Sequence, residues 1–176
     1  MKQVDISAGK VICTSLFLLY LTNIIFLCGW LHVWIAVPVC IVVSVGYVYA
    51  RKTILNICKY RISISFRGMV LLCVFILTLV WVCGTGGFFP QGYDHIVRNP
   101  IYRDLILYRW PVIYTDTNRA LCYYFGYWLL PALLSKILFV QCSEYMIWQG
   151  AQIVLYVYTV VNCLLISLLI CILIHK

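Results

Sequence analysis

Six side chains that could take part in chemistry lie within one polar stretch between apolar runs. They are two aspartates, one histidine and three arginines: Asp94, His95, Arg98, Arg103, Asp104 and Arg109. A carboxylate can take a proton from a hydroxyl as a general base, and a guanidinium can hold a phosphate through two parallel hydrogen bonds. The sequence therefore offers the aspartates as candidate catalytic residues. The arginines and the histidine are candidate substrate-binding residues.

Asp94 is the first acidic residue after Asp5, and it follows a glycine-rich exit from an apolar run. An acid near the bilayer boundary is costly unless it is solvated or paired, so it is a functional candidate. A solvated carboxylate paired with Arg98, one helical turn further on, stays open as the alternative. Asp104 falls on a short helix that we expect to begin at Asn99 and Pro100. The sequence does not show whether the two carboxylates meet.

That helix carries Ile101, Leu105 and Tyr108 on one face, which suits a helix lying on the outer membrane interface. Asp116 lies within Thr-Asp-Thr-Asn at 115–118, a composition typical of a turn.

Metal binding through histidine is not expected, because such a site needs several converging ligands and His95 has one acidic neighbour. The only cofactor left open is a divalent ion held by carboxylates and a lipid phosphate. A phosphate loop is not indicated either, because the glycine-rich stretch 84–92 has no following Lys-Ser or Lys-Thr pair.

The elements that must position these residues are membrane helices. Residues 11–50 contain no Lys, Arg, Asp or Glu. One helix of that length would be about 60 Å long, about twice the hydrocarbon thickness of a bilayer. We expect a transmembrane hairpin within residues 1–50, with its turn at 29–32. Further spans are expected over 69–84, over 120–140 with a kink at Pro131, and over 145–174.

The predicted fold is thus an all-α polytopic bundle of about five spans, with a short interfacial helix in an external loop. Apolar residues make up 65% and charged residues 10% of the chain, whereas soluble domains carry about 25% charge.

Orientation follows from the basic residues. The loop 51–68 has five of them and no acid, so we place it in the cytoplasm and the polar loop 85–119 outside. The unit 69–176 then holds the remaining spans of a multi-pass protein of the inner (plasma) membrane. Lys136 falls inside and Lys176 outside in this scheme. The basic loop is either a lipid-bound segment or a plain connector.

The net charge of +8 could suggest a nucleic-acid partner. The basic residues, however, mostly flank apolar runs rather than form one continuous surface. No nucleic acid is expected, and membrane lipid is the partner that the composition indicates.

Five segments, at 91–95, 99, 103–106, 110–114 and 123–136, resemble a group of bacterial polytopic proteins. These proteins are similar to the GT-C-type glycosyltransferase superfamily, whose members use polyprenyl-phosphate-linked sugar donors. The resemblance covers about residues 81–136. Because such enzymes have many more spans, it implies that this chain is the amino-terminal portion of one.

By that resemblance, Asp94 is the general base for an acceptor hydroxyl in direct displacement at the anomeric carbon of the sugar. Asp104 orients the acceptor or a metal ion. Arg98, Arg103 and Arg109 are the candidates that hold the lipid phosphate. Two other classes stay open: a non-catalytic membrane protein that binds a lipid or another membrane subunit, and a transporter component. Transport usually requires charges inside the spans, where only Lys136 qualifies.

Overall fold

The computed structural model describes residues 2–174, and most of them are helical. The helices are α1 (Ala8–Trp30), α2 (Val33–Ile57), α3 (Phe66–Val82), α4 (Tyr93–Leu107), α5 (Gly126–Leu138) and α6 (Glu144–Ile174). Strand β1 (Gln3–Ser7) pairs with β2 (Arg61–Ser65), and β3 (Ile113–Tyr114) pairs with β4 (Arg119–Ala120), both antiparallel. The helical class is confirmed, but the two strand pairs depart from the all-α prediction.

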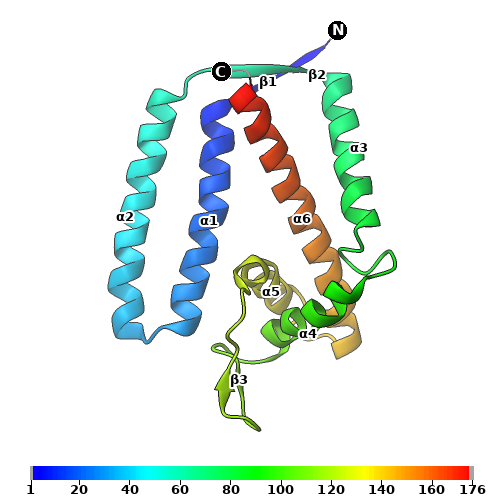
Figure 1. Cartoon of the computed structure of the whole chain (residues 1–176). Coiled ribbons are helices and arrows are strands. Elements are labelled where there is room, and N and C mark those ends of the chain that lie inside the picture. Colours follow the sequence, from blue (N-terminus) through cyan, green and yellow to red (C-terminus); the bar gives the residue numbers. More distant parts are fainter. Residues whose placement is uncertain (1, 175–176) are drawn as a thin grey trace.

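Three helices within the described residues, α1, α2 and α6, are long and apolar enough to cross a membrane. The sequence predicts about five spans. The expected third span is α3, which has 17 residues and is therefore about 25 Å long. Figure 1 shows α1, α2 and α6 running between the same two ends of the molecule, whereas α3 starts at the β1–β2 end and stops short of the far ends of the others.

The α1–α2 turn is shorter than predicted. It contains only Leu31 and His32, while Gly29 and Trp30 remain helical. A Cβ atom added at Gly29 would lie 3.0 Å from the Trp110 ring, so this glycine provides room for packing rather than a turn. α2 also continues past Arg51 and ends at Ile57.

The predicted loop 51–68 is not one loop. It contains the end of α2, strand β2 and the start of α3. β2 pairs with β1 from Gln3↔Ser65 to Ser7↔Arg61, and Ser63 Oγ donates a hydrogen bond of 2.6 Å to Asp5. Ile62 is buried against Ala8 and Ile172, so the strand pair closes one end of the helices (Figure 1).

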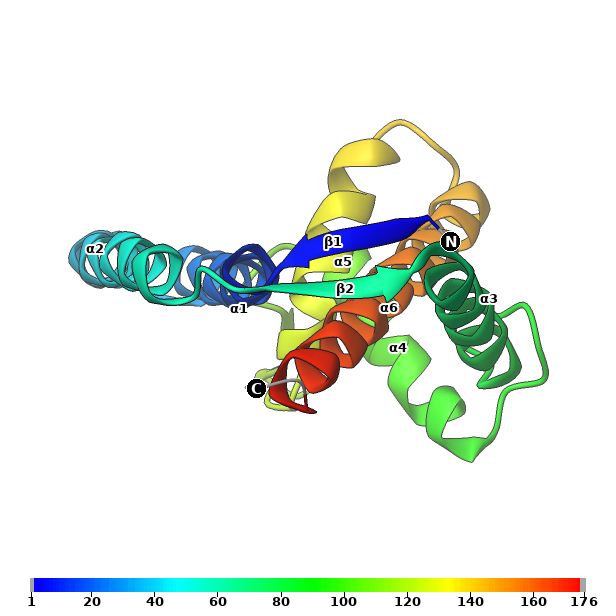
Figure 2. The ribbon, with the colours of Figure 1, turned by 90° about the horizontal axis from the view of Figure 1, so that it is seen from above.

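The expected span over 120–140 is wrong in its bounds and its direction. Its first residues belong to β4 or are irregular, and α5 covers only 13 residues with Pro131 inside the helix. Figure 1 shows α5 end-on, whereas Figure 2, seen from above, shows it lengthwise. α5 therefore lies across the long helices instead of running beside them.

The main hydrophobic core lies where α5 meets α4, α1 and α6. Its most deeply buried members include Tyr102, Leu105, Leu129, Ala132 and Ala151. This core holds α4, α5 and β3–β4 at the end of the molecule opposite β1–β2 (Figure 1).

Two placements in the predicted orientation change as a consequence. Lys136, on α5, donates a hydrogen bond to the carbonyl oxygen of Tyr108, directly after α4, so it lies at the α4 end of the molecule and not at the β1–β2 end. Ile172, near the end of α6, packs beside β2, so α6 returns to the end where the chain begins. Lys176 lies outside the described residues.

Candidate functional site

The predicted interfacial helix begins earlier than the sequence suggests. α4 starts at Tyr93 with Gly92 as its N-cap, so Asn99 and Pro100 are interior residues and not its start. The face that packs into the core is formed by Tyr102, Leu105 and Ile106. This corrects the predicted face, since Tyr108 follows the helix and is exposed.

The exit from α3 turns on three glycines. Gly84, Gly86 and Gly87 have φ values of 77°, 89° and 72°, in the left-handed region that side chains other than glycine disfavour. Gln91 Nε2 donates to Gly84 O at 2.8 Å, and Asn99 Nδ2 donates to Gln91 Oε1 at 2.8 Å. Side chains of this loop and of α4 thus fix the loop in place.

His95 completes this attachment. Its Nε2 lies 3.0 Å from the carbonyl oxygen of Cys83, which can only accept, so the imidazole donates its Nε2–H. The bond joins the first turn of α4 to the end of α3. His95 is therefore a positioning residue in this structure as well as a candidate ligand-binding residue.

Asp94 lies in the first turn of α4, where the helix dipole favours a negative charge. Its Oδ2 is 3.4 Å from Arg98 Nη2, and the two side chains are 74% and 41% exposed. The ion pair that the sequence left open as an alternative is therefore present. The pKa of Arg98 is raised, first by Tyr124 and then by Asp94, so the guanidinium keeps its charge.

Asp104 does not meet Asp94. The two residues are ten positions apart on one helix, which separates them by about 15 Å along its axis. Tyr114 Oη donates a hydrogen bond of 2.6 Å to Asp104 Oδ2, which attaches the β3–β4 hairpin to α4. Burial, and then this carboxylate, raise the pKa of Tyr114 to about 12. Asp116 lies in the turn of that hairpin, as predicted.

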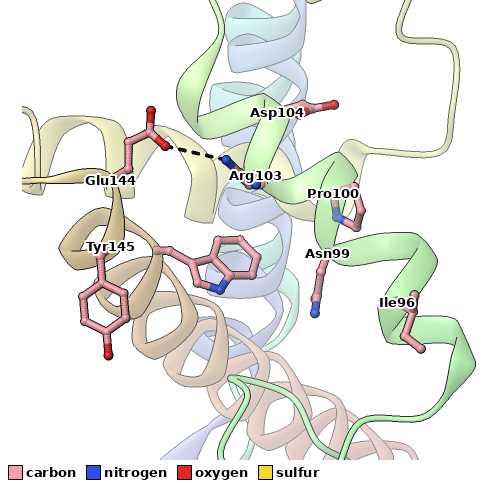
Figure 3. A pocket seen from close by; sticks show the side chains of 8 residues that line it. Ile96, Asn99, Pro100, Arg103, Asp104, Glu144 and Tyr145 are labelled. Carbon is pink, nitrogen blue, oxygen red and sulfur yellow. Dashed lines mark ion pairs between the residues drawn. The ribbon is translucent and has the colours of Figure 1, made fainter.

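The three arginines are also separated. Arg103 Nη2 lies 3.6 Å from Glu144 Oε2 beside a cavity of about 540 Å³ between α4 and α6. Figure 3 shows Arg103 pointing toward Glu144 and Asp104 pointing away from that pair. Arg109 lines a different cavity, together with Lys136. Of the three arginines, only Arg98 forms an ion pair with Asp94 among the described residues.

Arg98 also lines a cavity of about 270 Å³, which we call the amide cavity. Its walls come from the exit loop, α4, α5 with the residues before it, and α6. They include the polar side chains of Gln91, His95, Arg98, Asn99 and Gln152, and the aromatic rings of Tyr124, Tyr127 and Trp128. Three aromatic residues from the stretch 123–128 thus line the cavity beside the exit loop.

Gln152 is the site residue that the sequence analysis missed. It lies on α6, is only 4% exposed, and neither Oε1 nor Nε2 has a hydrogen-bond partner within the described residues. The sequence did contain a signal for it, because Gln152 lies inside a long run without charges. Burying an amide in apolar surroundings is costly unless the amide forms hydrogen bonds.

Between residues 2 and 174, no group of three or more His, Cys, Asp or Glu side chains lies close enough to hold a metal ion. No family model, curated protein or solved structure matches the chain.

Proposed function

We propose that the chain is the amino-terminal part of a GT-C-like glycosyltransferase, a multi-pass protein of the inner (plasma) membrane. It would move a sugar from a polyprenyl-phosphate donor to an acceptor outside the cytoplasm. The observation that carries this proposal is the Asp94–Arg98 pair, in which Arg98 also lines the amide cavity. A carboxylate, a guanidinium and a polar cavity thus lie together at one end of the apolar helices.

The proposed membrane arrangement has four crossing helices, α1, α2, α3 and α6, instead of the five spans expected from the sequence. Helix α5 lies across them near the outer face. The β1–β2 pair lies at the cytoplasmic face, where Lys59, Arg61 and Arg67 satisfy the preference for basic residues inside. α4 and β3–β4 then face the outside, where the lipid-linked sugar is presented.

The Asp94–Arg98 pair suggests an order of events. In the resting protein the Arg98 guanidinium neutralises the Asp94 carboxylate. An arriving donor phosphate binds Arg98 and leaves the carboxylate free to accept a proton. The acceptor hydroxyl oxygen then attacks the anomeric carbon, and its proton passes to Asp94. The bond from that carbon to the phosphate oxygen breaks, and the polyprenyl phosphate leaves with the bonding electron pair.

Asp104 has no base role in this proposal, because its Oδ2 already accepts the Tyr114 hydrogen bond. Arg103 is engaged by Glu144 and lies beside the other cavity. We assign both residues to holding α4 against its neighbours, and Arg98 to the phosphate.

The test is transfer of radiolabelled glucose, mannose or arabinose from undecaprenyl-phosphate donors in membranes that contain the whole protein. Asp94→Asn keeps the side-chain shape and removes the base. We expect it to lower the rate by about 100- to 10,000-fold, with unchanged protein level. Asp116→Asn, in the hairpin turn, is the matched control and should transfer at nearly the wild-type rate. Near-complete transfer by Asp94→Asn would exclude the catalytic assignment and favour a non-catalytic docking surface.

A further inference from the structure

We infer that the amide cavity holds the sugar ring of the lipid-linked donor, and that Gln152 determines sugar binding through hydrogen bonds to its hydroxyl groups. This inference rests on the proposed function, because it names the place of the donor sugar within that site. It adds a binding residue on α6 that neither the sequence motifs nor the Asp94–Arg98 pair indicates.

The first argument is the state of Gln152. A buried amide without a partner is costly, and such groups in native proteins call for an explanation. Both polar atoms of Gln152 lack a partner among the described residues, and the side chain lines the cavity. A ligand that both donates and accepts hydrogen bonds would satisfy the two atoms together, and a sugar hydroxyl does so.

The second argument is the composition of the walls. Asn99 and Gln91 already bond one another, but each retains further capacity for hydrogen bonds beside the cavity. Aromatic rings from Tyr124 and Trp128 supply flat apolar faces. Convergent amides with aromatic faces suit a sugar ring, which has polar hydroxyl edges and apolar C–H faces.

The third argument is size and access. About 270 Å³ is slightly below the range of drug-sized pockets, about 300–1,000 Å³, so the cavity suits one ring and not a lipid tail. The glycine at position 87 borders the Gln152 amide, and a Cβ atom there would lie 3.8 Å from Oε1. Because that position has no side chain, space remains beside the buried amide.

The position of Arg98 gives the donor a direction. Arg98 lines the same cavity and pairs with the exposed Asp94. If the donor phosphate binds Arg98 and the sugar lies inside the cavity, the anomeric carbon lies between the phosphate and the cavity. That is the atom at which the proposed displacement occurs.

The experiment measures dissociation constants of the whole chain in lipid nanodiscs by microscale thermophoresis. The probes are undecaprenyl phosphate and its glucose-, mannose- and arabinose-bearing forms. We expect at least one sugar-bearing lipid to bind more tightly than undecaprenyl phosphate. Gln152→Met has similar length but no amide, and we expect it to weaken binding of that lipid by about tenfold. Binding of undecaprenyl phosphate should change by less than about twofold, which also shows that the variant folds.

Gln149→Met is the matched control, because Gln149 lies on the same helix and is exposed. It should bind both classes of lipid as the wild type does. The inference is overturned if no sugar strengthens binding in the wild type, or if Gln152→Met keeps the full preference for the sugar. A cavity that holds only water gives these outcomes.

These outcomes are separable from the proposed function. If Asp94→Asn abolishes transfer while Gln152→Met binds the sugar normally, the catalytic proposal stands and this inference is wrong. If Gln152→Met loses sugar binding while Asp94→Asn keeps transfer, the inference stands and the catalytic assignment is wrong.

Discussion

At the scale of single residues, Tyr114 and Asp104 show how a candidate catalytic carboxylate can have a structural role. The Tyr114 phenol donates to Asp104, and its pKa is raised to about 12 by burial and then by this contact. The ordinary pKa of tyrosine is about 10. The folded chain therefore holds this proton more tightly than the unfolded chain.

A pH dependence follows. The contribution of Tyr114 to the free energy of unfolding is fully present below about pH 10 and is lost as the pH rises toward about 12. We expect Tyr114→Phe to remove part of the fall in melting temperature between about pH 10 and about pH 12. The control is Tyr93→Phe, because Tyr93 is exposed. An unchanged pH slope in Tyr114→Phe would contradict the assignment.

Tyr102 connects three elements from within the core. Its hydroxyl donates to Ala151 O on α6 at 2.9 Å and lies 3.3 Å from Ser135 Oγ on α5. Tyr102→Phe keeps the ring and should lower the free energy of unfolding by about 0.5–1.5 kcal/mol, the usual net value of one hydrogen bond. Thermal or denaturant unfolding in detergent would measure the change. Tyr145→Phe, at an exposed position on α6, should be neutral; an equal loss there would point to a general effect of removing a phenol.

At the scale of elements, the exit loop depends on backbone conformations that only glycine adopts easily. At Gly86 φ is 89°, and an added Cβ would lie 2.9 Å from Tyr156 Cβ and 2.8 Å from the Phe88 ring. We expect Gly86→Ala to destabilise the loop by at least about 1–2 kcal/mol from backbone strain alone. The readout is the melting temperature together with protease sensitivity at the loop.

The control for that substitution is Gly46→Ala. No heavy atom of residues 2–174, apart from its own helix and chain neighbours, lies within 4 Å of a Cβ built at Gly46. Alanine inside a helix is favoured over glycine by about 0.5–1 kcal/mol, so this variant should be neutral or slightly more stable. Similar melting temperatures for both variants would show that the positive φ at Gly86 imposes no strain.

The sequence predicts long elements better than short ones, for a physical reason. Runs without charge define α1, α2 and α6 because a membrane helix must bury its backbone polar groups internally and expose apolar side chains. The short helix α5, by contrast, packs against α4 and α6, and those contacts join segments that lie apart in the sequence. Pro100 suggested a helix start, but the structure accommodates it inside α4.

The candidate site was predictable only in part. Asp94 and Arg98, one helical turn apart, are close because helix geometry makes them neighbours. The position of Gln152 beside the amide cavity and the contact of Asp104 with Tyr114 depend on how distant segments pack together. The spacing of residues along the sequence does not predict that packing. β1–β2 pairing joins residues about sixty positions apart and was equally out of reach.

At the scale of the whole molecule, the decisive feature is that α5 lies across the long helices. A span over 120–140 would place the loop after α5 on the same side as Lys59. The structure places that loop at the end occupied by α4, so His95 and Gln141 should share one side of the membrane. The opposite side should contain β1–β2 and the connection between α2 and β2.

Single cysteines at positions 59, 95 and 141, in a background without the native cysteines, test this arrangement. Gln141 is exposed, and Lys59 lies in the irregular segment between α2 and β2. In intact cells an impermeant maleimide should label positions 95 and 141 but not 59, and all three after permeabilisation.

Labelling of 59 and 141 without 95, or of 95 alone, would place positions 95 and 141 on opposite sides of the membrane. Either result would mean that α5 crosses the membrane after all. Labelling of 59 alone would keep the four-helix arrangement and invert its orientation. Because the proposed donor site needs α4 outside the cytoplasm, that last result would also exclude the proposed glycosyl transfer there.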